Sequence, residues 1–174
     1  MTLVRYAWLG VVGGLVGAVL MAMVEMTSEL IAGHSFFLPP HMIAAPLFGP
    51  APMEHAMKGG PLYLETVPFV VGLIVHMMWT AGWGLLFGLI AGIARLAGLA
   101  AFSWGIAYAI AVGFVMSYVV LPLVRLDPIP QTSGWVPFFL MHVAYGIGPG
   151  AVIGYATRAQ RRASSEIRRA GITG

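Results

Sequence analysis

Hydrophobic residues in this chain fall into four long runs, separated by short polar or charged segments. The runs cover approximately residues 6–31, 67–94, 102–124 and 135–157. A helix needs about 20 mostly apolar residues to cross the hydrocarbon core of a bilayer. Without water in that core, each run must satisfy its own backbone hydrogen bonds, as a helix does. We therefore predict an all-α integral membrane protein, with one four-helix transmembrane domain over residues 1–174.

The composition agrees with this class. Of the 174 residues, 59% are hydrophobic and 9% are charged, whereas a water-soluble domain carries about 25% charged residues. The 23 glycines and 12 prolines are also tolerated more readily in membrane helices. Because the chain has no cysteine, disulfide scaffolds, thiolate metal sites and cysteine nucleophiles are excluded.

The basic residues predict the orientation of the four spans. Arg5 precedes the first span, Arg95 lies between the second and third, and a basic tail over 158–174 follows the fourth. Since cytoplasmic loops carry the excess of Lys and Arg, both termini are expected in the cytoplasm, with the protein in a bacterial-type inner membrane. The loop over 33–66 is then the outer loop, and its stretch 41–48 is expected to form a short helix on the membrane surface.

An internal repeat relates the second and fourth spans. Both contain a histidine, an aromatic residue three positions later, and glycines at further identical spacings: His76, Trp79, Gly82, Gly84 and Gly88 in one, and His142, Tyr145, Gly148, Gly150 and Gly154 in the other. The first and third spans match more weakly, through Gly10 with Gly105 and Met21 with Met116. Repeating a two-span unit predicts two parallel helical hairpins, related by a pseudo-twofold axis along the membrane normal.

This repeat places two imidazoles at one depth near the outer surface. His76 and His142 would lie on opposite sides of the axis, and Glu25 reaches a similar level from the first span. Ionisable groups at membrane depth usually face the protein interior. The pair could ligate a b-type haem, bind a metal with Glu25, or line a quinone pocket with aromatic neighbours. The candidate aromatic residues are Trp79, Trp83 and Tyr145.

Structural roles compete with these interpretations. Each histidine could instead hydrogen-bond a carbonyl or hydroxyl group on a neighbouring helix, and Glu25 could lie at the outer headgroup level. Glycines at every fourth position predict close helix packing, and Pro149 predicts a kink or wide turn. In the outer loop, Met53, His55 and Met57 form a conceivable copper site, but a proline-rich cap with incidental methionines is the favoured explanation.

The visible motifs favour a non-enzymatic role. The chain has no Gly-x4-Gly-Lys-Ser/Thr, His-Glu-x-x-His or Gly-x-Ser-x-Gly motif. We expect an accessory subunit of a larger membrane complex, with a respiratory or photosynthetic electron-transfer complex as its host. The alternative is an electron-transfer protein that binds bis-histidine haem or quinone, and the third is a small transporter or channel. Expected partners are membrane lipid, other integral membrane subunits and anionic lipid at the basic tail, and not nucleic acid.

Overall fold

The computed structural model describes residues 1–124 and 134–169, and within them the chain contains no β-strand. Four helical segments are long and apolar enough to cross a bilayer, which indicates a multi-pass membrane protein. They are α1 (Leu3–Ile31), α4 (Thr66–Ile93), α5 (Gly98–Val115) with its continuation to Leu123, and α8 (Trp135–Arg169). The all-helical class and the four apolar helices are therefore confirmed. The short outer loop expected before α8 falls mostly on residues 125–133, which lie outside the described residues.

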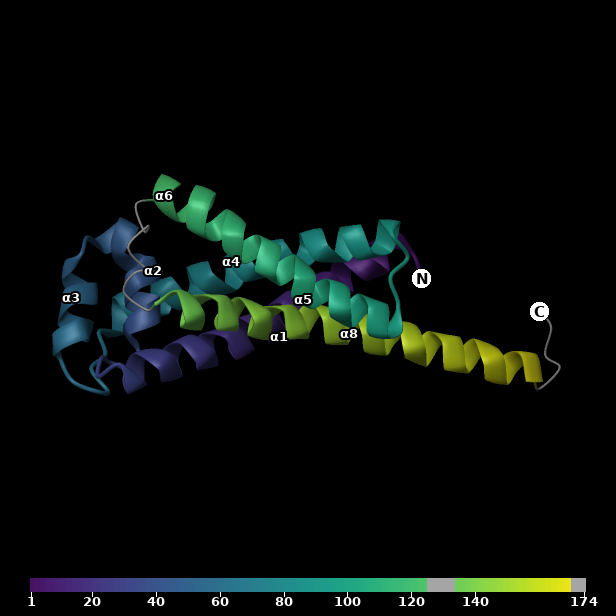
Figure 1. Cartoon of the computed structure of the whole chain (residues 1–174), viewed down its shortest axis with the longest axis horizontal. Helices are drawn as coiled ribbons and strands as arrows, with labels where there is room; N and C mark the ends of the chain where they lie inside the picture. The colour runs from purple at the N-terminus through teal and green to yellow at the C-terminus, as the bar shows by residue number, and fades with distance from the viewer. Residues whose placement is uncertain (125–133, 170–174) are drawn as a thin grey trace.

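Two short helices fold over one end of the bundle (Figure 1). They are α2 (Leu38–Phe48) and α3 (Ala51–Lys58), and we call residues 34–65 the cap. The expected short helix over 41–48 corresponds to α2, which packs against α4 and α3. His41 and Met42 are buried, and Gly72 of α4 touches the backbone of Pro40 so closely that a side chain there would clash.

The four long helices pack in the order α4, α1, α8, α5, and α4 barely touches α5 or α8. Glycines make the close contacts. Gly14 of α1 faces Gly84 of α4, and Gly105 of α5 faces Gly150 of α8. On the other side of α1, Gly17 contacts Gly148 of α8. Because glycine has no side chain, these backbones approach closely, as in membrane helix pairs generally.

Two predicted helix features differ in the structure. α8 continues through Pro149 without the expected wide turn and extends beyond residue 157, so that it projects past the other helices (Figure 1). The third span begins at Gly98, earlier than expected, and contains a π-helical turn at Met116–Val120 before α6 (Leu121–Leu123). Pro122 supplies a physical reason, since a proline ring clashes with the carbonyl four residues earlier and a wider turn relieves that clash.

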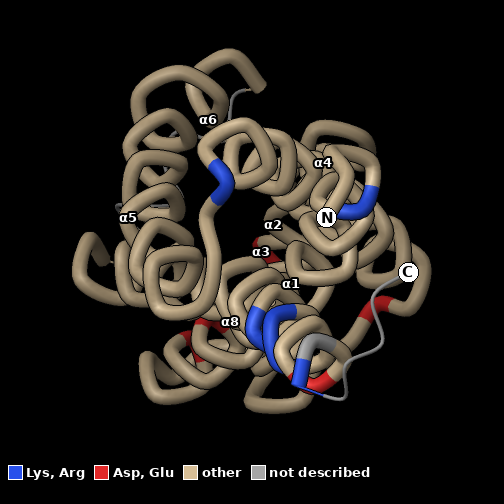
Figure 2. Tube along the Cα trace, turned by 90° about the vertical axis from the view of Figure 1, so that its right-hand side faces the viewer, with Lys and Arg blue, Asp and Glu red and all other residues tan. Residues whose placement is uncertain are grey.

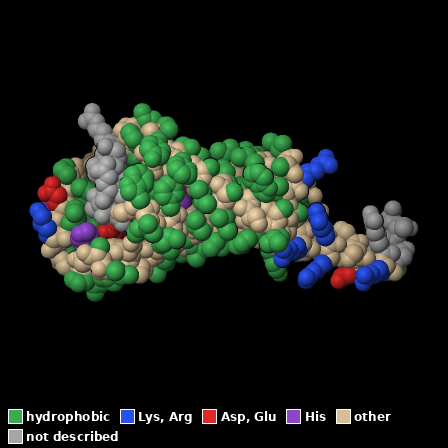
Figure 3. All heavy atoms as spheres, viewed as in Figure 1, with side chains coloured by type: hydrophobic (Ala, Val, Ile, Leu, Met, Phe, Trp, Pro, Cys, Tyr) green, Lys and Arg blue, Asp and Glu red, His purple; other side chains and the backbone are tan. Residues whose placement is uncertain are grey.

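Charged side chains lie at the two ends of the molecule, and hydrophobic side chains cover the length between them (Figure 3). Figure 2 looks onto the end opposite the cap, where Lys and Arg appear near the N-terminus, in the α4–α5 connection and along α8. We call this the basic end. Its exposed arginines include Arg5, Arg95, Arg158, Arg161 and Arg162.

Candidate functional site

A cavity of about 360 Å³ lies in the half of the bundle near the cap. We call it the outer cavity. Its lining comes from α1, α2, α4, α8 and the third span, including the π-helical turn. All five residues expected to bind a cofactor line this one cavity, together with Trp83: they are Glu25, His76, Trp79, His142 and Tyr145. The structure adds a contribution from α2, through Ile43, Pro46 and Leu47, which was not predicted.

An aromatic side chain separates α4 from α5 beside the cavity. The ring of Tyr108, on α5, packs beside Phe87 and Trp83 of α4, at centroid distances of 5.2 and 6.5 Å. Its hydroxyl donates a hydrogen bond to the Trp83 carbonyl at 2.8 Å. At Gly17 the backbones of α1 and α8 touch each other. Between α4 and α5, by contrast, Tyr108 places an aromatic ring. This bulk leaves room nearer the cap that the other helix pairs lack.

The mouth of the cavity faces sideways and is apolar. Its exposed lining residues are Val75 and Trp79 of α4, Pro46 and Leu47 of α2, and Val124 after α6. The polar lining residues lie deeper, since Glu25, His76 and His142 are all buried.

Each buried imidazole already uses one ring nitrogen. His76 Nε2 lies 3.3 Å from the carbonyl oxygen of Ala18 on α1, which is the interhelical hydrogen bond considered from the sequence. His142 Nδ1 lies 2.7 Å from the Phe138 carbonyl in its own helix. A carbonyl only accepts, so both nitrogens donate. In the neutral ring the other nitrogen is then a hydrogen-bond acceptor, Nδ1 of His76 and Nε2 of His142.

Glu25 adds a buried carboxyl group to the cavity. Its side chain is 7% exposed, and within residues 1–124 and 134–169 it forms no hydrogen bond or ion pair. Glu29, one turn later, differs because its carboxylate lies 2.7 Å from His34 Nδ1 at the start of the cap. Glu25 thus belongs to the cavity, whereas Glu29 fastens α1 to the cap.

Trp83 supplies the matching donor. Its indole Nε1 is buried and has no hydrogen-bond partner among the described residues. The Tyr145 hydroxyl is not available in the same way, because it donates to the Thr80 carbonyl at 2.8 Å. The cavity therefore combines acceptor nitrogens on two imidazoles with the carboxyl group of Glu25 and one indole donor. A molecule that matches it carries hydroxyl groups to donate and another oxygen to accept.

The conceivable copper ligands, Met53, His55 and Met57, lie in different surroundings. Met53 and Met57 lie one turn apart on α3 and pack against the hydrophobic core under the cap. His55 is exposed, and its Nδ1 lies 2.8 Å from Glu65 Oε1. No group of three His, Asp or Glu side chains suited to a metal occurs in the described part of the chain.

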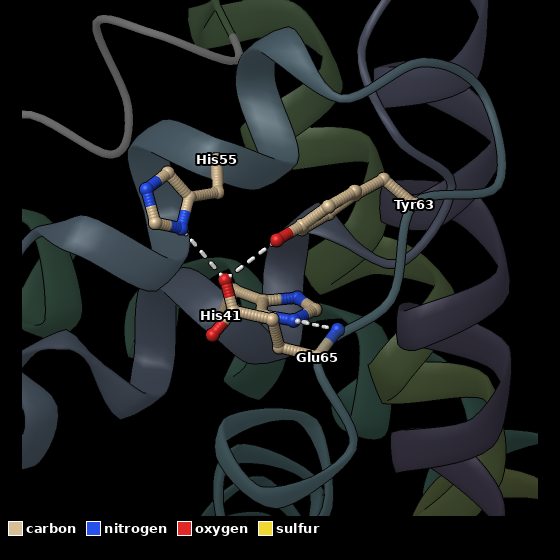
Figure 4. A network of polar contacts seen from close by, with 4 residues as sticks. All are labelled: His41, His55, Tyr63 and Glu65. Atoms are coloured by element: carbon tan, nitrogen blue, oxygen red, sulfur yellow. Dashed lines mark hydrogen bonds and ion pairs between the residues drawn. The ribbon is translucent and has the colours of Figure 1, made fainter.

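A polar network that the sequence did not reveal joins α2, α3 and the segment just before α4 within the cap (Figure 4). Glu65 Oε1 accepts hydrogen bonds from His55 Nδ1 at 2.8 Å and from the Tyr63 hydroxyl at 2.7 Å. These bonds lower the pKa of the Glu65 carboxyl and raise that of the Tyr63 phenol. The Glu65 backbone N–H donates to His41 Nε2 at 3.1 Å. These residues come from three separate segments, so no local spacing marks them.

The chain matches no protein-family model, no curated protein and no solved structure. Its function is therefore inferred from the cavity.

Proposed function

We propose that this chain is a multi-pass protein of a bacterial-type inner membrane that binds a quinol-class molecule in the outer cavity. The observation that carries the proposal is the set of polar groups around one apolar cavity: two imidazole acceptors, the Glu25 carboxyl group, and the Trp83 indole, which has no hydrogen-bond partner among the described residues. Small-molecule sites are typically apolar cavities of about 300–1,000 Å³ with a few convergent polar groups.

A quinol matches these groups in chemistry and in route of entry. Its ring hydroxyls can donate to the acceptor nitrogens of His76 and His142, and a ring oxygen can accept from Trp83. The ring can pack on the Trp79 indole, which is 47% exposed at the mouth. A long apolar tail can leave through the sideways mouth into lipid. Such a sideways opening favours a lipid-soluble ligand over a transported aqueous solute, and so disfavours a transporter or channel.

Within this proposal the chain is an accessory subunit of an electron-transfer complex, with other integral membrane subunits as partners. An exposed aromatic stack supports a partner-facing surface. Tyr118 of the π-helical turn stacks on Trp135 of α8 with an interplanar angle of 22°, and on Phe114 at 9°. All three residues are exposed. Tyr and Trp are enriched at protein interfaces and at membrane surfaces.

A bis-histidine haem is the second candidate, because both imidazoles line the same cavity. The nitrogens left for ligation differ, Nδ1 on His76 and Nε2 on His142, and His76 would keep its bond to Ala18. An optical spectrum separates the candidates. A Soret band that disappears in both His76→Ala and His142→Ala would establish haem and contradict the quinol proposal.

We also propose that the bundle consists of two parallel hairpins. A side chain on Gly14 would contact the Thr80 carbonyl and the Gly84 Cα atom, and one on Gly105 would contact the Gly146 carbonyl and the Gly150 Cα atom. These contacts are equivalent under the repeat of α4 and α8. By these contacts, Gly14 of α1 corresponds to Gly105 of α5. The sequence comparison had instead matched Gly105 with Gly10, which lies one helical turn before Gly14.

The same pairing accounts for the asymmetry of the bundle. Gly17 of α1 then corresponds to Tyr108 of α5. Gly17 closes the contact between α1 and α8, whereas Tyr108 keeps α4 and α5 apart. The two proposed repeats thus differ at this position: the helices touch where glycine stands and are separated where tyrosine stands. The outer cavity lies beside the separated pair, α4 and α5.

Binding of decylubiquinol to the purified protein tests the ligand proposal. Isothermal titration calorimetry in mild detergent should give saturable binding to the wild type. Trp83→Phe removes the indole donor and should weaken binding about fivefold, since a hydrogen bond contributes about 1 kcal/mol and 1.4 kcal/mol is tenfold in affinity. Trp104→Phe is the matched control, because Trp104 is exposed and does not line the cavity. No saturable binding, or equal weakening in both variants, would contradict the proposal.

A further inference from the structure

A second pocket, of about 700 Å³, lies at the basic end. Its polar lining comes from three elements: Tyr6 of α1, Arg95 of the α4–α5 turn, and Thr157, Gln160, Arg161, Ser164 and Ser165 of α8. We propose that this pocket binds a phosphate group, and that its source is the headgroup of an anionic phospholipid in the adjoining leaflet. This site is separate from the outer cavity and goes beyond a general attraction of the basic tail to lipid.

Hydrogen bonds fix the α4–α5 turn in place. The Tyr6 hydroxyl donates to the Leu96 carbonyl at 2.9 Å, which ties the turn to α1. The Gly98 backbone N–H donates to Thr157 Oγ1 at 3.0 Å, which ties it to α8. The turn that carries Arg95 is therefore held on both sides, and the pocket between α1 and α8 has a defined wall.

The backbone of Arg95 is strained. Its φ is +51°, in the left-handed region, and the bond from the Leu96 N–H to the Ala91 carbonyl closes the end of α4 around it. Glycine is the usual residue at such a helix end, because a side chain is disfavoured there. Strained positions cluster at functional sites. We therefore attribute the arginine at this unfavourable position to a binding role of its guanidinium group in the pocket.

The charge of the pocket suits an anion. Arg95 and Arg161 contribute two guanidinium groups, and no acidic residue lines the pocket. Arginine binds phosphate through paired N–H donors. Gln160 Oε1 is buried with no hydrogen-bond partner among the described residues. Rotating that amide by half a turn exchanges its oxygen and nitrogen, and would present an N–H donor to a bound anion.

The depth of the pocket favours a lipid over a free anion. Gly92, in the last turn of α4, lines it, and Arg95 lies just beyond Ile93, where that membrane helix ends. This is the level at which lipid headgroups meet a membrane helix, and basic side chains at this level attract anionic lipid. A headgroup phosphate could therefore enter while its acyl chains stay in the bilayer.

Thermal unfolding of the full chain in mild detergent tests the site. Short-chain phosphatidylglycerol should raise the melting temperature of the wild type in a saturable way, and phosphatidylcholine should not. Arg95→Gly removes the guanidinium and relieves the strained backbone, so this variant should be at least as stable as the wild type without lipid. Its apparent affinity for phosphatidylglycerol should fall at least tenfold. Arg162→Gln, which removes one charge outside the pocket lining, should keep the wild-type affinity.

Two results would overturn the proposal. Equal loss of affinity in Arg95→Gly and Arg162→Gln would show diffuse attraction to the basic end in place of a site. Inorganic phosphate is the third probe. If it stabilises the wild type as strongly as phosphatidylglycerol, and Arg95→Gly removes that effect, the phosphate chemistry stands and the lipid source is wrong.

Discussion

At the scale of single residues, two buried polar atoms stand out in the described part of the chain because they have no hydrogen-bond partner. They are Trp83 Nε1 and Gln160 Oε1. Most buried polar groups in folded proteins are paired, so each exception needs an explanation. Trp83 lines the outer cavity and Gln160 lines the pocket at the basic end. We interpret both atoms as groups that a bound molecule completes.

The Glu65 network predicts a pH-dependent cap. Hydrogen bonds from His55 and then Tyr63 lower the pKa of Glu65 below its ordinary value of 4.5. A lowered pKa means that folding favours the carboxylate. The contribution of the Glu65 carboxylate to the stability of the cap is therefore complete above about pH 4.5. It is lost as the pH falls through the lower pKa that Glu65 has in the folded protein. Hydrogen exchange of residues 34–65, corrected for intrinsic rates, should accelerate in that acid range.

A variant pair checks this assignment. Glu65→Gln should loosen the cap already at pH 6 and remove most of the acid-range change. Glu54→Gln, at an exposed position of α3, should behave as the wild type does. If the cap of Glu65→Gln loosens with acid as the wild type does, another group controls its attachment.

The sequence predicted individual site residues better than their hydrogen bonds. His76, His142 and Glu25 could be identified because ionisable groups are rare in apolar runs, and they do line one cavity. The importance of Tyr108 could not be predicted. Its effect depends on which helix its ring faces, and nothing in a uniformly apolar run shows that direction. The Glu65 network escaped notice for a similar reason, since its members meet only after the cap folds.

At the scale of elements, glycine positions decide which helices touch. Gly88 of α4 packs so closely on α1 that a methyl group there would clash with the Tyr6 carbonyl and lie 3.0 Å from the Gly10 Cα atom. Gly82 of the same helix has no atom within 4 Å of the corresponding position. These two glycines therefore form a matched pair for testing the packing.

Gly88→Ala should destabilise the protein and Gly82→Ala should not. Overpacking a close contact costs about 1–3 kcal/mol, whereas a substitution away from contacts usually stays within about 0.5 kcal/mol. Thermal unfolding in mild detergent, followed by circular dichroism, measures the difference. Equal melting temperatures for the two variants would show that α1 and α4 do not touch at Gly88.

Four apolar elements could be predicted because hydrophobicity over about 20 residues is a strong signal. Their details were less predictable. The π-helical turn at Met116–Val120 comes from a local backbone adjustment near Pro122, and a run of hydrophobic residues does not record it. The position of α2 against α4 depends on the Gly72 contact with Pro40, which is a tertiary feature.

At the scale of the whole molecule, the basic end and the cap lie at opposite ends of the long helices. The proposed topology places the basic end in the cytoplasm and the cap outside. The chain has no native cysteine, so single cysteines can report on this directly. In intact cells, a membrane-impermeant maleimide should label Glu54→Cys in the cap and should not label Ala163→Cys in α8. After the cells are opened, both should react. The reverse pattern would invert the topology.

The central claim is that the open contact between α4 and α5 forms a binding cavity for a lipid-soluble molecule. Native mass spectrometry of the protein released from its own membranes tests this most directly. We predict one apolar adduct with the mass of a quinone or quinol on the wild type and on Val115→Phe, whose side chain is exposed outside the cavity. Val112→Phe adds bulk at the buried cavity wall and should lose the adduct. A wild type without any such adduct, or a Val112→Phe variant that retains it fully, would contradict the account.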